Sequence, residues 1–341
     1  MTNKIRPRIT PEEYEIVKKA RRIEAEARKS GLDPNDVKHM WIKDKHSFFV
    51  PNPGYRQKEQ SAFHEALVDL VRNHSISCTP GPKRQLKEGK LLVIDPADVH
   101  IGKLANAFET GENYNTEIAI QRVHEGVDGI LDKIRGVDIE RIVFIGGNDI
   151  LHVDNSSRTT TRGTPQDTDV MWYDAFLKAM QLYLDVLKKL IDIADVQYIH
   201  CMSNHDYVNG WMLSQCVQAY FEKHDRISFD TSPKHRKYVN YGQNLLGFTH
   251  GDGAKQKDLP ILMANEAKTW WSQTKHRYIY SHHVHHKTGK DYPGVVFETL
   301  RSPSGTDAYH HKNGYQHAPM AIEAFVHDRK YGQEMRISHF F

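Results

Sequence analysis

The sequence predicts an α/β fold with two packed sheets, preceded by a small basic helical module. Two observations predict the sheets: apolar strands alternate with helical patterns after residue 90, and the last third turns to shorter, β-like segments. A third observation separates the module. Residues 1–90 carry 19 Lys and Arg against 12 Asp and Glu, whereas residues 91–341 carry 27 against 31. The two parts therefore differ in charge as well as in pattern.

The first 74 residues are predicted to form the basic module. Thr10 can cap a helix that runs to about Ser30, with Pro11 at its first position and the basic turn KKARR inside it. A second helix is predicted over about 60–73. Between the helices, the aromatic and basic segment 40–55 ends in Pro, Asn and Gly, which is typical of a small hairpin or wing.

Residues 75–90 are predicted to be a linker, because this stretch holds prolines and glycines and has no amphipathic period. The domain over 91–341 follows. Its predicted strands are 91–97, 141–147 and 196–202, and its predicted helices are 116–134 and 167–193. The β-like segments NLLGFTHG, YIYSHH, GVVFETL and APMAIEAFVHD are predicted to form a mixed second sheet packed against the first.

Composition excludes several classes of protein. A chain of 341 residues with 39% hydrophobic and 26% charged residues is neither a disordered chain nor a membrane-embedded one. Its apolar runs are far shorter than the roughly 20 residues that a membrane-spanning helix needs. The three cysteines are odd in number and widely spaced, which argues against a disulfide framework. We therefore expect a cytoplasmic protein, without membrane contact, in a bacterial or phage-infected cell.

Five polar clusters follow apolar runs, and they gather the residues that can bind metals. They are Asp98-x-His100, Gly147-Asn148-Asp149 with His152, Ser203-Asn204-His205-Asp206, His250-Gly251-Asp252, and the tract His282-His283-Val284-His285-His286. Taken alone, each of the first two clusters has an ordinary explanation, because Asp and Asn are common in turns after strands. The histidine tract is harder to explain by packing, because a strand would place its imidazoles on both faces and each would need a partner. A basic surface patch is the alternative there.

In this order the clusters resemble the calcineurin-like metallophosphoesterase superfamily, whose pattern is D-x-H, G-D-x-x-D/H, G-N-H-D/E, a lone His and G-H-x-H. The resemblance spans about 91–305 and implies a two-sheet αββα sandwich. The chain departs from the pattern in three places. Asn148 separates Gly147 from Asp149, Ser203 precedes Asn204, and His282 precedes His283. The last motif therefore has alternative registers among its four histidines.

The resemblance implies a centre of two divalent metal ions. One ion would be held by Asp98, His100, Asp149 and His285, and the other by Asp149, Asn204, His250 and His283, so that Asp149 bridges them. Oxygen and imidazole ligands without a thiolate suit manganese best, with iron, zinc or magnesium as alternatives. In such enzymes a metal-bridging hydroxide attacks phosphorus. His205 would assist the leaving group, and His152 would contact the phosphate.

Within the superfamily, the chain lacks the G-D-x-x-D-R-G and G-N-H-E motifs of protein phosphatases. Asp149-Ile-Leu-His152 and Asn204-His205-Asp206 instead resemble SbcD-type DNA repair nucleases, so the expected activity is that of a DNA nuclease. A phosphodiesterase acting on cyclic or small nucleotides is one alternative, and a non-catalytic nucleic-acid-binding protein is another. SbcD-type enzymes have an SMC-like ATPase partner, so the resemblance suggests such a partner for this chain. A free-standing enzyme or a homodimer is equally compatible with the sequence.

Candidate substrate-binding residues lie in both parts of the chain. In the module, Lys18, Lys19, Arg21 and Arg22 can follow a phosphate backbone, and neighbouring aromatic residues such as Trp41 can stack on unpaired bases. A solvated amphipathic helix over a small aromatic core is the alternative. In the second part, Arg158 and Arg162 flank a threonine-rich loop that can hold phosphates, or that is an ordinary surface loop.

Overall fold

The computed structural model describes Lys18, Arg21 and residues 24–29, 39–43, 47–51, 89–315 and 317–341. The chain divides into two compact units, Met1–Ile76 and Ser77–Phe341. The domain boundaries predicted at residues 74 and 90 stay predictions.

In the first unit, the described residues Lys18, Arg21 and 24–29 are helical, in agreement with the helix predicted to run to Ser30. Strand β1 (His39–Lys43) pairs antiparallel with β2 (Ser47–Pro51), which confirms the hairpin predicted over 40–55. The predicted helix over 60–73 and all but the last two residues of the predicted linker lie outside the described residues.

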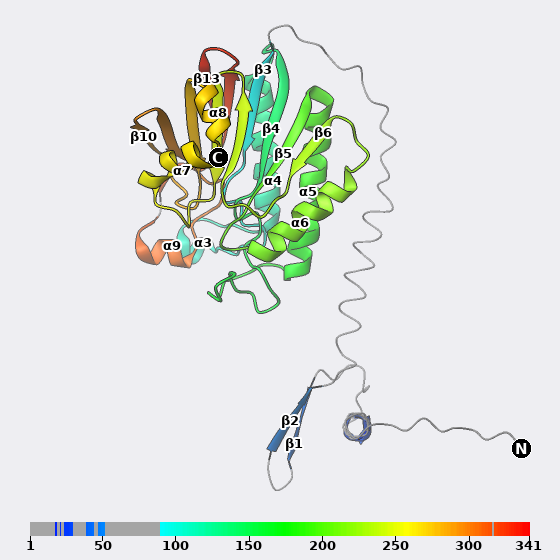
Figure 1. Ribbon diagram of the computed structural model, residues 1–341. Coiled ribbons are helices and arrows are strands. Elements are labelled where there is room, and N and C mark those ends of the chain that lie inside the picture. Colours follow the sequence, from blue (N-terminus) through cyan, green and yellow to red (C-terminus); the bar gives the residue numbers. More distant parts are fainter. Residues whose placement is uncertain are drawn as a thin grey trace, which may run out of the picture. The chain divides into compact units, whose positions relative to one another are not determined.

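Two mixed sheets form the centre of the second unit (Figure 1). The larger sheet has the order β13-β12-β3-β4-β5-β6, in which β3 to β6 are parallel and β12 pairs antiparallel with both β3 and β13. Its strands are β3 (Lys90–Asp95), β4 (Ile139–Gly147), β5 (Asp195–Cys201), β6 (Ile227–Asp230), β12 (Ala321–Asp328) and β13 (Gly332–Phe340).

The smaller sheet has the order β10-β11-β9-β8-β7, with β8, β9 and β11 parallel to one another. Its strands are β7 (Lys237–Tyr241), β8 (Asn244–Thr249), β9 (His276–Ser281), β10 (Thr288–Tyr292) and β11 (Val295–Thr299). The outer strands β7 and β10 are antiparallel to their neighbours.

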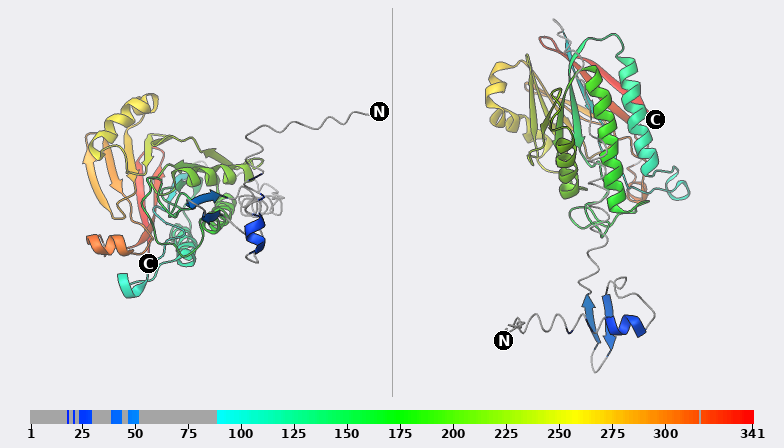
Figure 2. Two further views of the ribbon diagram at one scale, coloured as in Figure 1. Left: turned by 90° about the horizontal axis from the view of Figure 1, so that it is seen from below. Right: turned by 90° about the vertical axis from the view of Figure 1, so that its right-hand side faces the viewer.

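Helices cover the outer faces of both sheets, which gives the αββα layering that the resemblance implies. Figure 2 shows α4 and α5 on one side of the sheets and the yellow α7 and α8 on the other. The helices are α3 (Ala107–Thr110), α4 (Thr116–Lys133), α5 (Trp172–Ile193), α6 (Tyr207–Tyr220), the short 3-10 helix η2 (Gln256–Asp258), α7 (Leu259–Glu266), α8 (Lys268–Gln273) and α9 (Ala308–Asn313). In the described part of the chain, no helix is long and apolar enough to cross a membrane.

The core lies between the two sheets, because strands of each sheet present alternate side chains to the other. Leu91 and Val93 of β3, for example, pack in one cluster with Leu246 and Phe248 of β8, all essentially inaccessible to solvent. This packing fixes the carboxyl ends of β3, β4, β5, β8 and β9 relative to one another.

One assignment from the sequence was wrong. The segment 318–328 was predicted to belong to the second sheet, but its strand β12 pairs with β3 in the first sheet. Seven of the eight residues of β12 are buried, as expected of a central strand covered on both faces. A mostly apolar run indicates such a strand but carries no information about its partner.

Gly147, at the end of β4, is required for the turn that leads to Asp149. Its φ is +78°, and an added Cβ would collide with the carbonyl oxygen of Cys201 and Nδ1 of His200. We expect Gly147→Ala to lower the free energy of unfolding by about 2 kcal/mol or more, measured by urea denaturation. Gly136→Ala is the matched control, because Gly136 has a φ of +92° but open space around it. Equal losses in both variants would contradict this account.

Candidate metal centre

The predicted metal ligands lie in the loops that leave five strands at one edge of the sandwich. Asp98 follows β3, Asp149 follows β4 and Asn204 follows β5, while His250 and His283 follow β8 and β9. The two sheets meet there: the backbone N–H of His283 donates to the Asp98 carboxylate at 3.0 Å. Residues distant in sequence therefore share one site, as parallel strand ends commonly arrange.

The first cluster consists of Asp98, His100 and His285, whose ligand atoms lie within 4.8 Å of one another. Nε2 of His100 is 3.3 Å from Nε2 of His285, and Asp98 Oδ1 is 3.6 Å from the same His285 atom. Asp98 and His100 are buried, and His285 is only slightly exposed. Three of the four ligands predicted for the first ion are thus together.

The second cluster consists of Asp149, His250 and His283, again within 4.8 Å of one another. Nε2 of His250 lies 3.1 Å from Asp149 Oδ2 and 2.8 Å from Asn204 Oδ1. His250 Nδ1 lies 4.0 Å from Asp98 Oδ1, which places the two clusters side by side. All four residues predicted for the second ion therefore converge.

The backbone at these ligands is strained. Eight non-glycine residues among those described have a positive φ, and five of them are predicted ligands. These five, with φ between 52° and 72°, are Asp98, His100, Asp149, His283 and His285. The left-handed conformation costs an L-residue roughly 1–2 kcal/mol, and such strain gathers at functional sites. The fold thus gives up stability to aim these side chains at common points.

Burial keeps most of the clustered imidazoles neutral. It lowers the pKa of His100 well below its ordinary value, with the neighbouring His205 adding to the effect, and it lowers the pKa of His285 and His283 in the same direction. A neutral imidazole offers the lone pair that a metal ion needs.

Asp149 and His250 form a buried charged pair. Burial opposes charge on both, but their mutual attraction dominates, so the pKa of Asp149 falls and that of His250 rises to about 9. Burial raises the pKa of Asp98 to about 6, because its desolvation outweighs the attraction of His250. Without a metal ion, the proton on His250 thus stabilises the negative charge of Asp149. A bound cation would take over this role and displace the proton from His250.

These residues fit a pair of divalent cations. Carboxylate, amide and imidazole groups, which are common metal ligands, converge here. The two Nε2 atoms of His100 and His285, for example, lie 3.3 Å apart, a distance that suits two ligands of one ion better than a direct hydrogen bond. Within the described residues, Nδ1 of His250 is also buried without a hydrogen-bond partner. Asp149 presents one oxygen to His250 and the other to the backbone N–H of His205.

The contacts of the histidine tract favour His283 and His285 over the alternative register. Both nitrogens of His282 are engaged, since Nδ1 lies 3.0 Å from the Thr249 carbonyl oxygen and Nε2 lies 3.0 Å from both oxygens of Asp95. His286 is exposed, and its Nδ1 bonds to the Val284 carbonyl oxygen.

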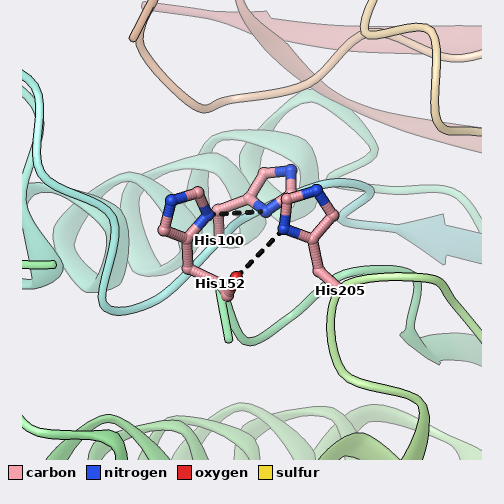
Figure 3. A group of neighbouring side chains, drawn as sticks. All are labelled: His100, His152 and His205. Atoms are coloured by element: carbon pink, nitrogen blue, oxygen red, sulfur yellow. Dashed lines mark hydrogen bonds between the residues drawn. The ribbon is translucent and has the colours of Figure 1, made fainter. Parts of the chain in front are cut away.

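The two predicted catalytic histidines, His152 and His205, form a third group with His100 (Figure 3). The His205 ring lies over the His152 ring at 5.3 Å, and His205 Nδ1 lies 3.0 Å from the His152 carbonyl oxygen. Because a carbonyl only accepts, Nδ1 carries the proton and Nε2 is left for the cleft. His152 Nδ1 is 3.4 Å from His100 Nδ1.

A cleft of about 1060 Å³ opens beside the clusters. His100, Asp149, His152, Asn204, His205, His283 and His285 line it, as does the predicted substrate-binding residue Arg162. The guanidinium of Arg158 instead lies 3.2 Å from Met171 Sδ and outside the lining. Lys18 and Arg21 are exposed on the first unit, whereas Lys19 and Arg22 lie outside the described residues.

Sequence reasoning did not single out Asp95, and it placed Asp206 in a motif without giving it a supporting role. Asp95 holds His282. Asp206, which is buried, accepts from Leu151 N at 2.9 Å and from Ser203 Oγ at 2.6 Å and so joins two ligand-bearing loops. Its burial, together with the Asp149 charge, raises its pKa to about 7. Asp206 lies inside a motif and Asp95 lies three residues before Asp98, so closeness to the motifs was the only sequence signal for their supporting role.

No family model and no curated protein matches the chain. Among solved structures, the chain is similar to an archaeal phosphodiesterase (9% identity, 74% of this chain and 99% of that chain covered, TM-score 0.35). It is also similar to zinc-complexed Vps29 from Entamoeba histolytica (10%, 73% and 98%, 0.31) and to YfcE, a phosphoesterase from E. coli (12%, 73% and 98%, 0.35).

Proposed function

We propose that the protein is a two-metal phosphodiesterase. The observation that carries the proposal is the convergence of two adjacent Asp/His clusters, on strained backbone, at one edge of the cleft. Asp98, His100, Asp149 and His285 would hold one cation, and Asp149, Asn204, His250 and His283 the other. Two such cations orient a phosphate and neutralise the charge that develops on it during hydrolysis.

His205 is the proposed proton donor to the leaving oxygen. Its Nδ1–H bond to the His152 carbonyl oxygen fixes the ring and leaves Nε2 to carry the transferable proton. Its backbone N–H donates to Asp149 Oδ1 at 2.9 Å, which ties the ring to the centre without using the imidazole.

His152 is the proposed phosphate contact. Burial, reinforced by the neighbouring His205, lowers its pKa well below the ordinary value, so the ring is neutral at pH 7. If His100 uses Nε2 as its ligand atom, its Nδ1 carries the proton and donates to His152 Nδ1, 3.4 Å away, so that Nε2–H of His152 is the donor to a phosphate oxygen in the cleft.

DNA is the proposed substrate, because the motifs resemble those of SbcD-type nucleases. A cleft of about 1060 Å³ accommodates more than a single phosphate, and the exposed Lys18 and Arg21 give the first unit cationic side chains. A basic unit follows the backbone of a polyanion and makes its affinity depend on salt.

Charge removal in the first unit tests the DNA interaction in the full chain. We expect the variant with Lys18, Lys19, Arg21 and Arg22 all changed to Ala to bind duplex DNA more weakly. The slope of log K against log salt should become shallower by about 0.9 for each phosphate that the variant no longer neutralises. The matched control changes Lys133, Arg135, Lys223 and Lys275 to Ala, which removes equal charge from exposed positions of the second unit. Equal slopes in the two variants would show that net charge, and not this unit, governs binding.

The function itself is tested by manganese-dependent hydrolysis of end-labelled single- and double-stranded DNA, beside bis-p-nitrophenyl phosphate and a cyclic nucleotide. Cleavage of DNA that chelation abolishes supports the nuclease, and the labelled products give its polarity. Hydrolysis of only the small diesters would redirect the proposal to small nucleotides. DNA binding without any hydrolysis would indicate a non-catalytic binding protein.

A further inference from the structure

A series of neighbouring aromatic rings extends from the first metal cluster along the cleft. The His310 ring stacks on the His285 ring at 5.0 Å with an interplanar angle of 23°. Tyr309 lies against His310 at 5.7 Å, and Tyr315 lies 6.5 Å from Tyr309. We call Tyr309, His310 and Tyr315 the ring wall. All three line the cleft, and none belongs to the motifs that the sequence analysis singled out.

His310 of the ring wall is held in place by Asp307. Asp307 caps α9 and accepts from both the backbone N–H and Nδ1 of His310, at 2.8 and 2.6 Å. Its other oxygen pairs at 2.9 Å with Nζ of Lys103, a lysine that is 1% exposed. Lys103 follows the His100 motif, so His310 is anchored to the loop that carries a proposed ligand. An anchored surface loses little entropy when a substrate binds.

The tyrosines themselves are unusually open to solvent. Tyr309 and Tyr315 are each 65% exposed, and the cleft-lining Leu104 and Val284 are also exposed. Exposed apolar groups gathered at the rim of a site mark a binding surface. The rings present flat faces with polar edges, which suits flat heterocycles better than aliphatic chains.

A second cavity, of about 290 Å³, adjoins this wall. His285, His310 and Tyr315 line it as well as the cleft, together with polar residues that include Glu112, Ser304 and Thr306. It offers a flat ring both a stacking partner and hydrogen-bonding groups beside a proposed metal ligand.

We propose that the ring wall stacks on unpaired nucleobases next to the scissile phosphate, so that the substrate is a single strand or an unpaired end. The inference rests on the phosphodiesterase function proposed above and specifies its substrate. Bases paired inside a duplex are stacked on one another and cannot lie against these rings, whereas an unpaired base stacks on an aromatic side chain whatever its sequence.

The test couples a change in the protein to a change in the substrate. A fluorescein-labelled thymidine strand is compared with a strand of equal length carrying abasic residues. Affinity is measured by anisotropy in EDTA and kcat/KM in manganese. We expect the wild-type chain to prefer the strand with bases by about tenfold or more, and Tyr309→Ala/Tyr315→Ala to reduce that preference to about twofold or less. Tyr309→Phe/Tyr315→Phe keeps the rings and should keep the preference.

Tyr331→Ala is the control, because Tyr331 is 68% exposed but lies outside the cleft lining. An unchanged preference in the double alanine variant would overturn the proposal, as would an equal loss in the phenylalanine variant. If the wild-type chain hydrolyses neither these strands nor duplex DNA nor bis-p-nitrophenyl phosphate, the proposed function fails, and the affinities in EDTA still decide whether the rings stack on bases.

Discussion

Asp149→Ala is expected to abolish hydrolysis and to release bound metal. Asp149 is the one carboxylate assigned to both cations. One of its oxygens contacts His250 Nε2, and the other accepts from the backbone N–H of His205. Its loss should lower kcat by roughly 10³-fold or more, because two-metal chemistry needs both ions. Bound manganese, measured by elemental analysis after dialysis, should fall from two ions per chain to one or none.

A conservative variant separates the ligand role from a folding defect. Asp149→Asn keeps the shape and one oxygen donor but removes the charge, so we expect it to fold like the wild-type chain and to lose metal. Thermal unfolding of both variants in EDTA reports the fold. If either variant retained two tightly bound manganese ions, Asp149 would not be the bridge.

His205→Ala is expected to lose turnover and keep metal. The imidazole supplies the proposed proton, whereas the bond to Asp149 comes from the backbone N–H, which alanine retains. We expect kcat on DNA to fall by roughly 10²–10⁴-fold, the range for general acid catalysis. The fall should be smaller for bis-p-nitrophenyl phosphate, whose leaving group needs less help from a proton. The assay pairs kcat on both substrates with metal content.

Two outcomes of that experiment would count against this role. Full activity in His205→Ala would remove His205 from the mechanism. Loss of one metal ion would instead make His205 a ligand, since His100, His152 and His205 form a cluster of their own.

The sequence predicted the strands that carry the site better than their surroundings. β3, β4, β5, β8 and β9 fall on the predicted apolar runs, because each run ends at a polar cluster that marks the strand end. Strands such as β7, β10 and β13 were not predicted. The hydrophobic pattern of a segment predicts whether it forms a helix or a strand. Which strands pair is decided by long-range packing, as the placement of β12 beside β3 shows.

The seven predicted ligands were selected by motif order, whereas their supporting residues depend on tertiary contacts. No sequence motif includes Lys103 or Asp307, yet the fold buries Lys103 and joins the pair at 2.9 Å. Likewise, His310 looks like one histidine among 22 until the fold stacks it on His285. Local sequence cannot report such pairs, because they form only when distant loops meet.

The most direct test of the metal centre is manganese anomalous scattering from crystals of the full chain grown with manganese chloride. We predict two peaks, one among Asp98, His100, Asp149 and His285 and the other among Asp149, Asn204, His250 and His283. A single peak among His100, His152 and His205, or no peak at either predicted position, would contradict the two-metal assignment.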